Sequence, residues 1–380
     1  MGVFVNPDNS EFQTVVNSNI YIDKTGLLKY TNEVMNTLQG YICSSSPERF
    51  GKSIIASMLA AYYSKGCNSE GLFSKLKIGG ETDWKKYLNQ YNIIYLDLQW
   101  CIESAGGPNE VVPYISKNVI KELKDIYPTI SEVNPISVPE MLLRIHAATG
   151  EKFIVIIDDW DILFRTENAD VNIREKYINF LRGMFHGTMS TRYLQLAYLT
   201  GILPIAKGQV QSVLSNFMSY SILNPGPLEA YNRFTKDDVE QLCSKFQRSD
   251  NEVNKWYGGY WTRNGYIYDP NSVVRFIFDG ELRSYWLGGE LCTAIISLIN
   301  MDFDGVREQL SKMVKGECVT VENLEFRDIV TGFASRDNIL TYLIHLGYLT
   351  YDWNSKKAFI PNEDVRGKVR RMVGSPCRKL

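Results

Sequence analysis

Short apolar segments that alternate with helical patterns constrain the fold of this chain more than any other feature. Four such segments are rich in β-branched or aromatic residues, and a fifth, weaker one follows them. The predicted strands are Gly40–Ser45, Asn92–Leu98, Phe153–Asp159, Tyr193–Gly201 and Phe217–Leu223. Strands that alternate with amphipathic helices are typical of a parallel sheet covered by helices on both faces. The sequence therefore predicts an α/β fold.

The composition excludes several classes of protein. The 380 residues carry a net charge of −2, unlike the basic surface of a protein that coats nucleic acid. The seven cysteines form no Cys-x-x-Cys pair and the three histidines lie far apart, so no metal-ligand spacing can be drawn. The sequence shows neither a signal peptide nor an apolar run long enough to span a membrane. We expect a cytoplasmic protein without a membrane partner.

Acidic and basic residues are nearly balanced over the chain, but the run RGKVRRMVGSPCRKL at residues 366–380 is basic. It contains no acidic residue and includes Arg366, Lys368, Arg370 and Arg371. A solvated terminal helix and tail would explain such a run, and so would contact with a nucleic-acid backbone. The sequence leaves both interpretations open.

The segment SPERFGKS, residues 46–53, joins the first predicted strand to an apolar helix. Its end has the pattern of a phosphate-binding loop. In such a loop Gly51 would let the backbone approach a phosphate closely, Lys52 would contact the phosphate and Ser53 would bind Mg²⁺. The glycine that normally opens this motif is replaced by Ser46. Gly-Lys-Ser alone occurs often by chance, but the order strand, loop and helix is the one that phosphate binding requires.

Two further strands end in polar residues that suit the same chemistry. The run FIVIIDDWD ends in Asp158, which would hold hydrated Mg²⁺, and Asp159, which would polarise the attacking water. Asp159 stands where a glutamate is usual, and the alternative is that both acids only cap the strand. Thr200 ends the fourth strand, where it could sense the γ-phosphate or simply begin a turn.

These motifs together resemble the AAA-ATPase-like family, and the resemblance runs from about Glu11 to about Arg366. The segments that carry it include NIYIDKTGLLKY, SPERFGKSIIASMLAAYYS, FIVIIDDWD, LTGILPIAKG, FTKDDVEQL, NKWYGGY and IYDPNSVVRFI. The resemblance implies a P-loop ATPase that binds ATP through Pro47, Arg49, Phe50, Gly51, Lys52, Ser53 and Ile54. It also implies Mg²⁺ at Ser53 and Asp158, and catalytic roles for Asp159 and Thr200. Where the family typically has two loop arginines, this chain has Ser46 and Glu48.

Three domains are predicted, and the run Pro225-Gly226-Pro227 marks the first boundary. Residues 1–225 would form the P-loop ATPase domain with an N-terminal extension, and residues 226–324 a helical domain. Residues 325–380 would form a winged helix with a basic tail, because they read as helix, strand, turn, strand and helix. Family members often carry a C-terminal PD-(D/E)XK nuclease-like domain. Too few residues follow the predicted winged helix to form one, so the sequence is either truncated or lacks that domain.

Three functions are compatible with this sequence. The first is a slow Mg²⁺-dependent ATPase whose nucleotide state regulates a homo-oligomer or a protein partner. The second is a nucleotide-regulated interaction module with little hydrolysis, which Glu48 and Asp159 favour. The third is a DNA-associated factor that acts through the winged helix and the basic tail.

Overall fold

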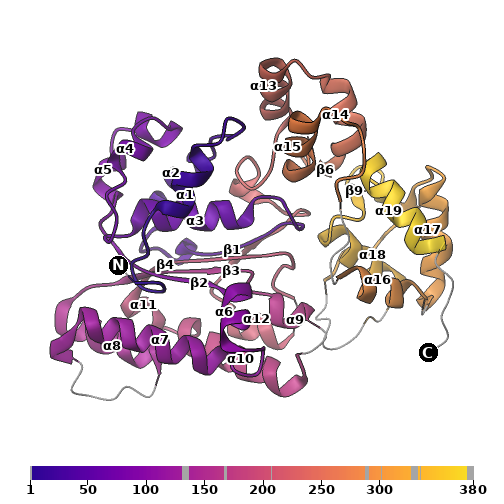
Figure 1. Ribbon diagram of the computed structural model, residues 1–380. Coiled ribbons are helices and arrows are strands. Elements are labelled where there is room, and N and C mark those ends of the chain that lie inside the picture. The colour runs from indigo at the N-terminus through magenta and orange to yellow at the C-terminus, as the bar shows by residue number, and fades with distance from the viewer. Residues whose placement is uncertain are drawn as a thin grey trace. The chain divides into compact units, whose positions relative to one another are not determined.

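The computed structural model describes residues 2–130, 137–166, 169–206, 208–286, 291–300, 302–326, 333 and 335–374. The chain forms two compact units (Figure 1). The first unit contains Met1–Ser44, Lys52–Gly201 and Gly208–Ser219. The second contains Ser45–Gly51, Ile202–Lys207 and Tyr220–Leu380. The loop that precedes Lys52 thus belongs to the second unit, although the flanking strand and helix belong mainly to the first.

A five-stranded sheet forms the centre of the first unit, and each strand lies where the sequence predicts one. The strands are β1 (Tyr41–Ser45), β2 (Asn92–Asp97), β3 (Phe153–Asp158), β4 (Leu194–Gly201) and β5 (Met218–Tyr220). Their order is β2-β3-β4-β1-β5, and β3 runs parallel to both β2 and β4. Strand β3 is buried along its whole length, as expected for a parallel sheet between two helical layers. The predicted α/β class is confirmed.

Helices cover both faces of this sheet (Figure 1). Helix α3 (Lys52–Tyr63) contacts β2, β3 and β4 on one face, whereas α7 (Val111–Ile126), α8 (Val138–Thr149) and α10 (Val171–Phe185) pack together on the other. The remaining α-helices of this unit are α1 (Ser10–Val16), α2 (Leu27–Val34), α4 (Glu70–Phe73), α5 (Trp84–Tyr87), α6 (Leu98–Ala105), α9 (Ile162–Arg165), α11 (Ser190–Tyr193) and α12 (Gln209–Val213). Short 3₁₀ turns are Leu38–Gly40, Lys77–Gly80 and Pro128–Ile130.

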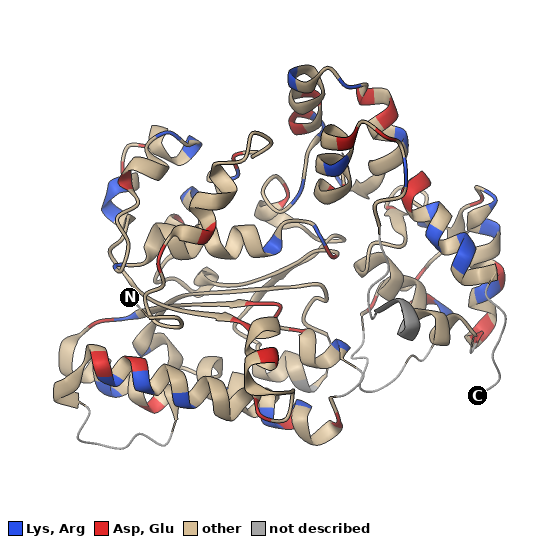
Figure 2. Ribbon diagram, in the orientation of Figure 1, with Lys and Arg blue, Asp and Glu red and all other residues tan. Residues whose placement is uncertain are grey.

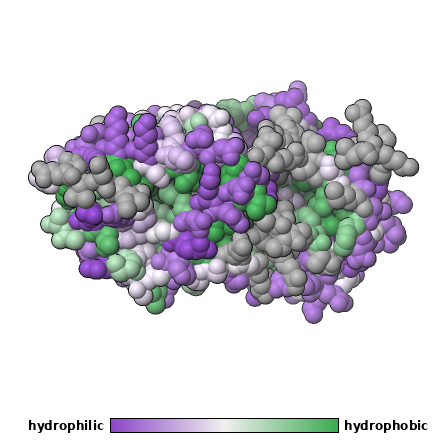
Figure 3. Space-filling model, turned by 90° about the horizontal axis from the view of Figure 1, so that it is seen from below, coloured by the Kyte–Doolittle hydropathy of each residue, from purple (hydrophilic) through white to green (hydrophobic). Residues whose placement is uncertain are grey.

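The outer helices of the first unit are amphipathic. In α7 the buried residues Val111, Ile115, Val119 and Leu123 recur at every fourth position. Lys and Arg alternate with Asp and Glu along α7, α8 and α10 (Figure 2). From below, hydrophilic side chains cover much of the first unit, with apolar residues showing as separate green areas (Figure 3). Among the described residues, no helix has the length and apolar character needed to cross a membrane.

The second unit is mostly helical and contains two small sheets. Its α-helices are α13 (Lys236–Phe246), α14 (Asp250–Tyr257), α15 (Pro270–Asp279), α16 (Leu291–Asn300), α17 (Val306–Val314), α18 (Arg336–His345) and α19 (Glu363–Gly374), and its 3₁₀ turns are Gly226–Leu228 and Phe303–Gly305. Strands β6 (Tyr260–Thr262) and β7 (Gly265–Ile267) form a hairpin. Strands β8 (Val319–Thr320), β9 (Thr350–Asp352) and β10 (Lys357–Phe359) form a sheet in the order β8-β10-β9. The predicted order helix, strand, turn, strand and helix therefore appears as α18, β9, β10 and α19.

The basic run at the C-terminal end is partly engaged within the second unit. Arg366 of α19 donates hydrogen bonds to the carbonyl oxygens of Met313 and Val314, at 3.1 and 3.2 Å. The Lys368 ammonium is buried and lies 5.5 Å from the ring centroid of Trp286. These two side chains therefore contact other parts of the second unit. Residues 375–380 of the run lie outside the described part of the chain.

Candidate functional site

The start of α3 supplies the two polar residues that end the predicted phosphate loop. Lys52 begins the helix and is 9% exposed, and Ser53 follows it at an exposed position. Gly51 has a φ of +81°, a left-handed conformation that glycine adopts without strain. A Cβ built on Gly51 would meet no atom within 4 Å, so the backbone there borders open space. This local geometry leaves room for a ligand beside the helix N-terminus.

The ends of β3 and β4 bring two other predicted residues together. The Thr200 hydroxyl donates a short hydrogen bond to the carboxylate of Asp158. The Ser53 side chain also hydrogen-bonds the Asp158 carboxylate. Because Asp158 and Thr200 are almost fully buried, these contacts hold the carboxylate in one orientation. The structure thus places Ser53, Asp158 and Thr200 in one cluster within the first unit.

The Lys52 ammonium lies among carboxylates. Burial lowers its pKa, and the negative charges of Asp159 and Asp158 oppose that shift. Burial likewise raises the pKa of Asp158, while the Ser53 and Thr200 hydrogen bonds oppose the rise. Each buried charge therefore depends on the other for stability. An added phosphate would provide a further counter-charge for Lys52.

Asp159 does not continue strand β3. Its φ is 53°, in the left-handed region that aspartate tolerates better than most residues. Its carboxylate lies 3.4 Å from the guanidinium of Arg165, which also binds Asp161 at 2.8 Å. Burial raises the pKa of Asp159 to about 6, and the ammonium of Lys52 opposes this rise. At neutral pH the side chain is thus mostly ionised and can accept a proton.

Sequence reasoning missed several charged residues that share this edge of the sheet. Asp97 ends β2 and is paired in register with Asp158, and burial raises its pKa. The charges of Asp158 and Asp97 add to the effect of burial in raising the pKa of Glu11. Arg165 and Asp161 form an ion pair in which both side chains are at least nine-tenths buried. Asp97 could have been found, because it follows an apolar strand in the same way as Asp158. Arg165 and Glu11 follow no strand and match no motif.

The loop residues that precede Gly51 have partners in the second unit, to which they belong. Arg49 donates a hydrogen bond to the carbonyl oxygen of Tyr285 at 2.9 Å. The ring of Phe50 packs edge-on against Tyr260, with centroids 5.2 Å apart. Arg49 also has a φ of 68°, which shapes the turn. The side chains of Arg49 and Phe50 thus serve packing, which leaves the backbone of the loop as the part suited to bind a phosphate.

The other predicted loop residues are placed as follows. Pro47 is buried, and a Cβ on Gly347 would meet its ring at 2.8 Å. Ile54 is 41% exposed on the first turn of α3. The hydroxyl oxygen of Ser46 is buried and has no hydrogen-bond partner, so the loop contains one unsatisfied polar group. This orphaned hydroxyl fits a loop that receives a polar ligand.

The donor set also fits Mg²⁺. This ion keeps several waters and is commonly held by one or two protein oxygens together with substrate phosphates. Ser53 and Asp158 provide a hydroxyl and a carboxylate already in contact with each other. Among the described residues no group of three or more His, Cys, Asp or Glu side chains could hold a metal ion. A magnesium ion held by Ser53 and Asp158 would be completed by phosphate oxygens and water.

Comparison with known proteins gives a family and several loose structural likenesses. A sequence model of the family described as Predicted AAA-ATPase matches residues 9–211, more than half of the chain. An uncharacterized protein in the vnfD 5′ region of Azotobacter chroococcum mcd 1 is 24% identical over 300 residues, which cover 73% of this chain. This chain spans about half, 52%, of that relative's length.

Two solved structures match this chain only loosely, at low sequence identity. The Walker-type ATPase of Pyrococcus abyssi is 14% identical, with a TM-score of 0.43 over 91% of this chain and 94% of its own. The ORC2 protein of Aeropyrum pernix, in ADPNP–ADP complexes, is 11% identical, with a TM-score of 0.42 over 95% of this chain and 97% of its own.

Proposed function

The chain belongs to the Predicted AAA-ATPase family, and from this premise we propose that it binds ATP with Mg²⁺ and hydrolyses it slowly. The observation that carries the proposal is the cluster at the edge of the first unit's sheet. There the hydroxyls of Ser53 and Thr200 hold the Asp158 carboxylate, and the Lys52 ammonium lies near the same acid. This arrangement supplies a phosphate-binding cation and a metal-binding carboxylate side by side.

In this proposal the start of α3 binds the phosphates of ATP. The backbone N–H groups at the helix N-terminus point toward the ligand, and the Lys52 ammonium adds a charge-assisted contact. The open space beside Gly51 supports close approach of a phosphate. Ser53 and Asp158 would hold Mg²⁺, which neutralises charge on the phosphates when it is bound. Thr200 keeps the Asp158 carboxylate in position through its hydrogen bond.

Asp159 is the proposed general base, and two observations support slow turnover. An aspartate is one methylene shorter than the usual glutamate, so its carboxylate reaches less far toward a water molecule. Its carboxylate is also held near Arg165, whose guanidinium competes with that water. The pKa of about 6 still leaves Asp159 able to take a proton at neutral pH. Hydrolysis is therefore proposed to persist at a reduced rate.

The nucleotide state would regulate a partner or an assembly through the second unit. The loop that leads into Lys52 is held in that unit by Arg49 and Phe50. A phosphate bound at Lys52 would therefore constrain a loop whose other end is packed into the second unit. We propose that residues 226–324 form a helical domain and that residues 325–380 form a winged-helix domain. A homo-oligomer and a protein partner are both compatible with it.

The binding part of the proposal is tested by removing the Lys52 ammonium. Lys52→Ala deletes a charge-assisted contact, so affinity for ATP should fall roughly ten- to hundredfold. A fluorescent ATP analogue with Mg²⁺ is titrated against the wild type and the variant. Lys117→Ala is the matched control, because Lys117 is exposed on α7 and should leave affinity unchanged. Equal dissociation constants for wild type and Lys52→Ala, with unchanged circular dichroism, would refute the assignment.

A further inference from the structure

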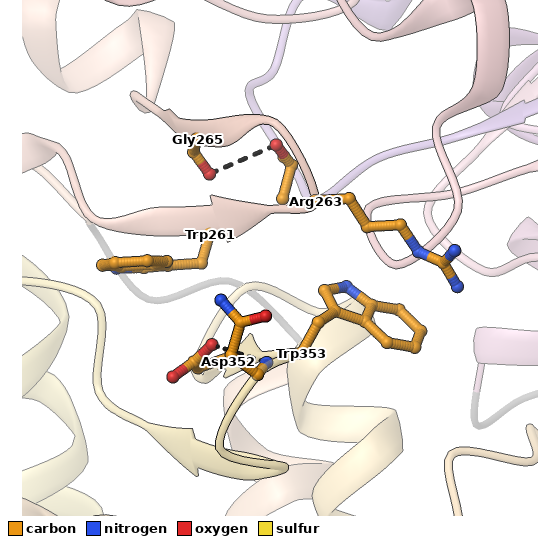
Figure 4. Close-up of a pocket in the computed structure, with 7 residues that line it drawn as sticks. Trp261, Arg263, Gly265, Asp352 and Trp353 are labelled. Carbon is orange, nitrogen blue, oxygen red and sulfur yellow. Dashed lines mark hydrogen bonds between the residues drawn. The ribbon is translucent and has the colours of Figure 1, made fainter.

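Two hairpins of the second unit border a pocket of about 400 Å³. Its walls come from the β6–β7 hairpin and from the end of β9 with the turn that follows (Figure 4). The Trp261 backbone N–H donates to the Thr350 hydroxyl at 2.6 Å and so joins the two hairpins. A volume of this size suits a small ligand or one unit of a polymer. Neither the family motifs nor the proposed ATPase chemistry uses this pocket.

Two indole rings provide the apolar part of the pocket. Trp261 is 39% exposed and packs edge-on against Phe359, which supports its ring from β10. The Trp353 indole lies on the other side of the pocket, after the end of β9 (Figure 4). The Nε1 atom of Trp353 is buried and has no hydrogen-bond partner, although a buried indole N–H normally finds one. The pocket therefore offers one exposed flat ring, that of Trp261.

Charges of both signs border the pocket, with Arg263 on the β6–β7 hairpin and Asp352 at the end of β9. The Arg263 side chain extends over the Trp353 ring, 4.3 Å from its centroid (Figure 4). No described carboxylate forms an ion pair with Arg263, nor with Lys356 or Lys357, the two exposed lysines beside the β9–β10 turn. The nearby Asp352 carboxylate accepts hydrogen bonds from its own turn, at 2.9 and 2.7 Å. Within the described part of the chain, Arg263 and Lys356 are thus left without an ion-pair partner, whereas Lys357 is paired in register with Asp352, whose carboxylate is already hydrogen-bonded.

A ligand that satisfies all of these groups needs a flat ring and an anionic group. We propose that the pocket binds a nucleotide unit of single-stranded nucleic acid. The base would stack on Trp261, and the phosphate would contact the guanidinium of Arg263. Lys356 and Lys357 would contact the neighbouring phosphates. A proline-rich peptide would also use the exposed indole face, but it would leave Arg263 and Lys356 without an ion-pair partner.

The test is fluorescence anisotropy with a labelled oligothymidylate at about 50 mM salt, where phosphate contacts are strong. Trp261→Ala should weaken binding roughly ten- to hundredfold, because it removes the stacking surface. Arg263→Gln should weaken binding and lower the slope of log affinity against log salt by about one unit. Both side chains are exposed or half-exposed, so neither change should unfold the protein.

Two control variants on α15 match these changes. Phe278→Ala removes an aromatic ring that is 65% exposed, and Arg275→Gln removes an exposed guanidinium. Both should bind the oligonucleotide as the wild type does. Lys52→Ala should also bind it normally, which separates this pocket from the ATP site.

Competition identifies the source of the nucleotide unit. Tighter binding of the oligomer than of thymidine monophosphate supports a polymer, whereas equal affinity would assign the pocket to free nucleotides. Displacement of the oligomer by duplex DNA at equal affinity would overturn the stacking arrangement, because paired bases cannot reach Trp261. A proline-rich peptide that bound while the oligomer did not would overturn the proposal, as would an oligomer affinity unchanged in Trp261→Ala and Arg263→Gln.

Discussion

Each unit of this protein contains a pair of neighbouring carboxylates of which at least one is buried, and the two pairs are stabilised in different ways. In the first unit, Asp158 and Asp159 lie near the Lys52 ammonium, whose pKa their charges raise against the effect of burial. In the second unit, Asp269 and Asp364 share the hydroxyl of Ser272, at 2.9 and 2.8 Å. A hydroxyl has one proton to donate, so it cannot satisfy two ionised carboxylates. Protonation therefore reduces the repulsion between the two carboxylates of the second pair. In the first pair the Lys52 cation reduces it.

This difference separates a ligand site from a structural cluster. Asp269 caps α15 by accepting the backbone N–H groups of Asn271 and Ser272, and Asp364 accepts one from Trp286. These contacts fix both carboxylates of the second pair within the fold. The first pair instead lies near the ammonium of Lys52, at the start of α3. A pair of acids therefore indicates a binding site when the cation beside it can also contact a bound ligand.

The largest expected effect is that of Asp158→Asn on ATP hydrolysis. Loss of this carboxylate removes the proposed metal contact, worth several kcal/mol of transition-state stabilisation, so turnover should fall at least about a hundredfold. Magnesium-dependent nucleotide binding should weaken as well. Asp97→Asn is the control, because Asp97 lies beside Asp158 in register but outside its hydrogen-bonded cluster. Steady-state phosphate release measures the turnover of both variants. An Asp158→Asn turnover above a tenth of the wild-type value would contradict the metal assignment.

A smaller effect is expected for Asp159. Asp159→Asn removes the proposed base and should lower turnover roughly a hundredfold, with ATP affinity changed only a few-fold. Because the pKa of Asp159 is raised to about 6, the active ionised form is lost as the pH falls below that value. Wild-type turnover should therefore decrease below about pH 6, and the variant should lack this decrease. A flat wild-type profile between about pH 5 and pH 7 would exclude Asp159 as the base.

The smallest effect concerns stability and the second pair. Burial raises the pKa of Asp269 from 3.8 to about 7, so the folded state binds a proton that the unfolded state releases between these values. This group's contribution to stability is complete below about pH 4 and is lost as the pH rises toward 7, at roughly 1.4 kcal/mol per pH unit. Asp269→Asn should remove that slope from the free energy of urea unfolding. The control Asp237→Asn, at an exposed position, should keep the pH slope of the wild type. An unchanged slope in Asp269→Asn would show that Asp269 is ionised throughout.

Much of the first unit could be predicted from the sequence because its signals are local. Each strand is a short apolar run, and Ser53, Asp158 and Thr200 lie directly after a strand or at its end. The carboxyl ends of parallel strands meet at one edge of a sheet, which is why neighbouring runs predict neighbouring side chains. Arg165 could not be found in this way, because its contact with Asp159 depends on the turn after β3.

In the second unit the sequence predicted elements but not their contacts. The order of α18, β9, β10 and α19 follows from local patterns, as does the capping box of Thr235 and Asp238 at the start of α13. The basic run shows only charge in the sequence, which left a solvated tail and a nucleic-acid contact both open. Arg366 and Lys368 are instead held by carbonyl groups and aromatic rings from distant parts of the chain.

The sequence alone determined the strands, the helix that follows the phosphate loop and the polar residues at the strand ends. These depend on periodicity and on residue types within a few positions. Tertiary structure decided that β4 lies between β3 and β1, and that Arg49 and Phe50 are held within the second unit. It also decided that Arg263 stacks on Trp353 beside an exposed Trp261. Such partners are chosen by packing between segments far apart in the chain, and no local pattern of residues encodes which segments will meet.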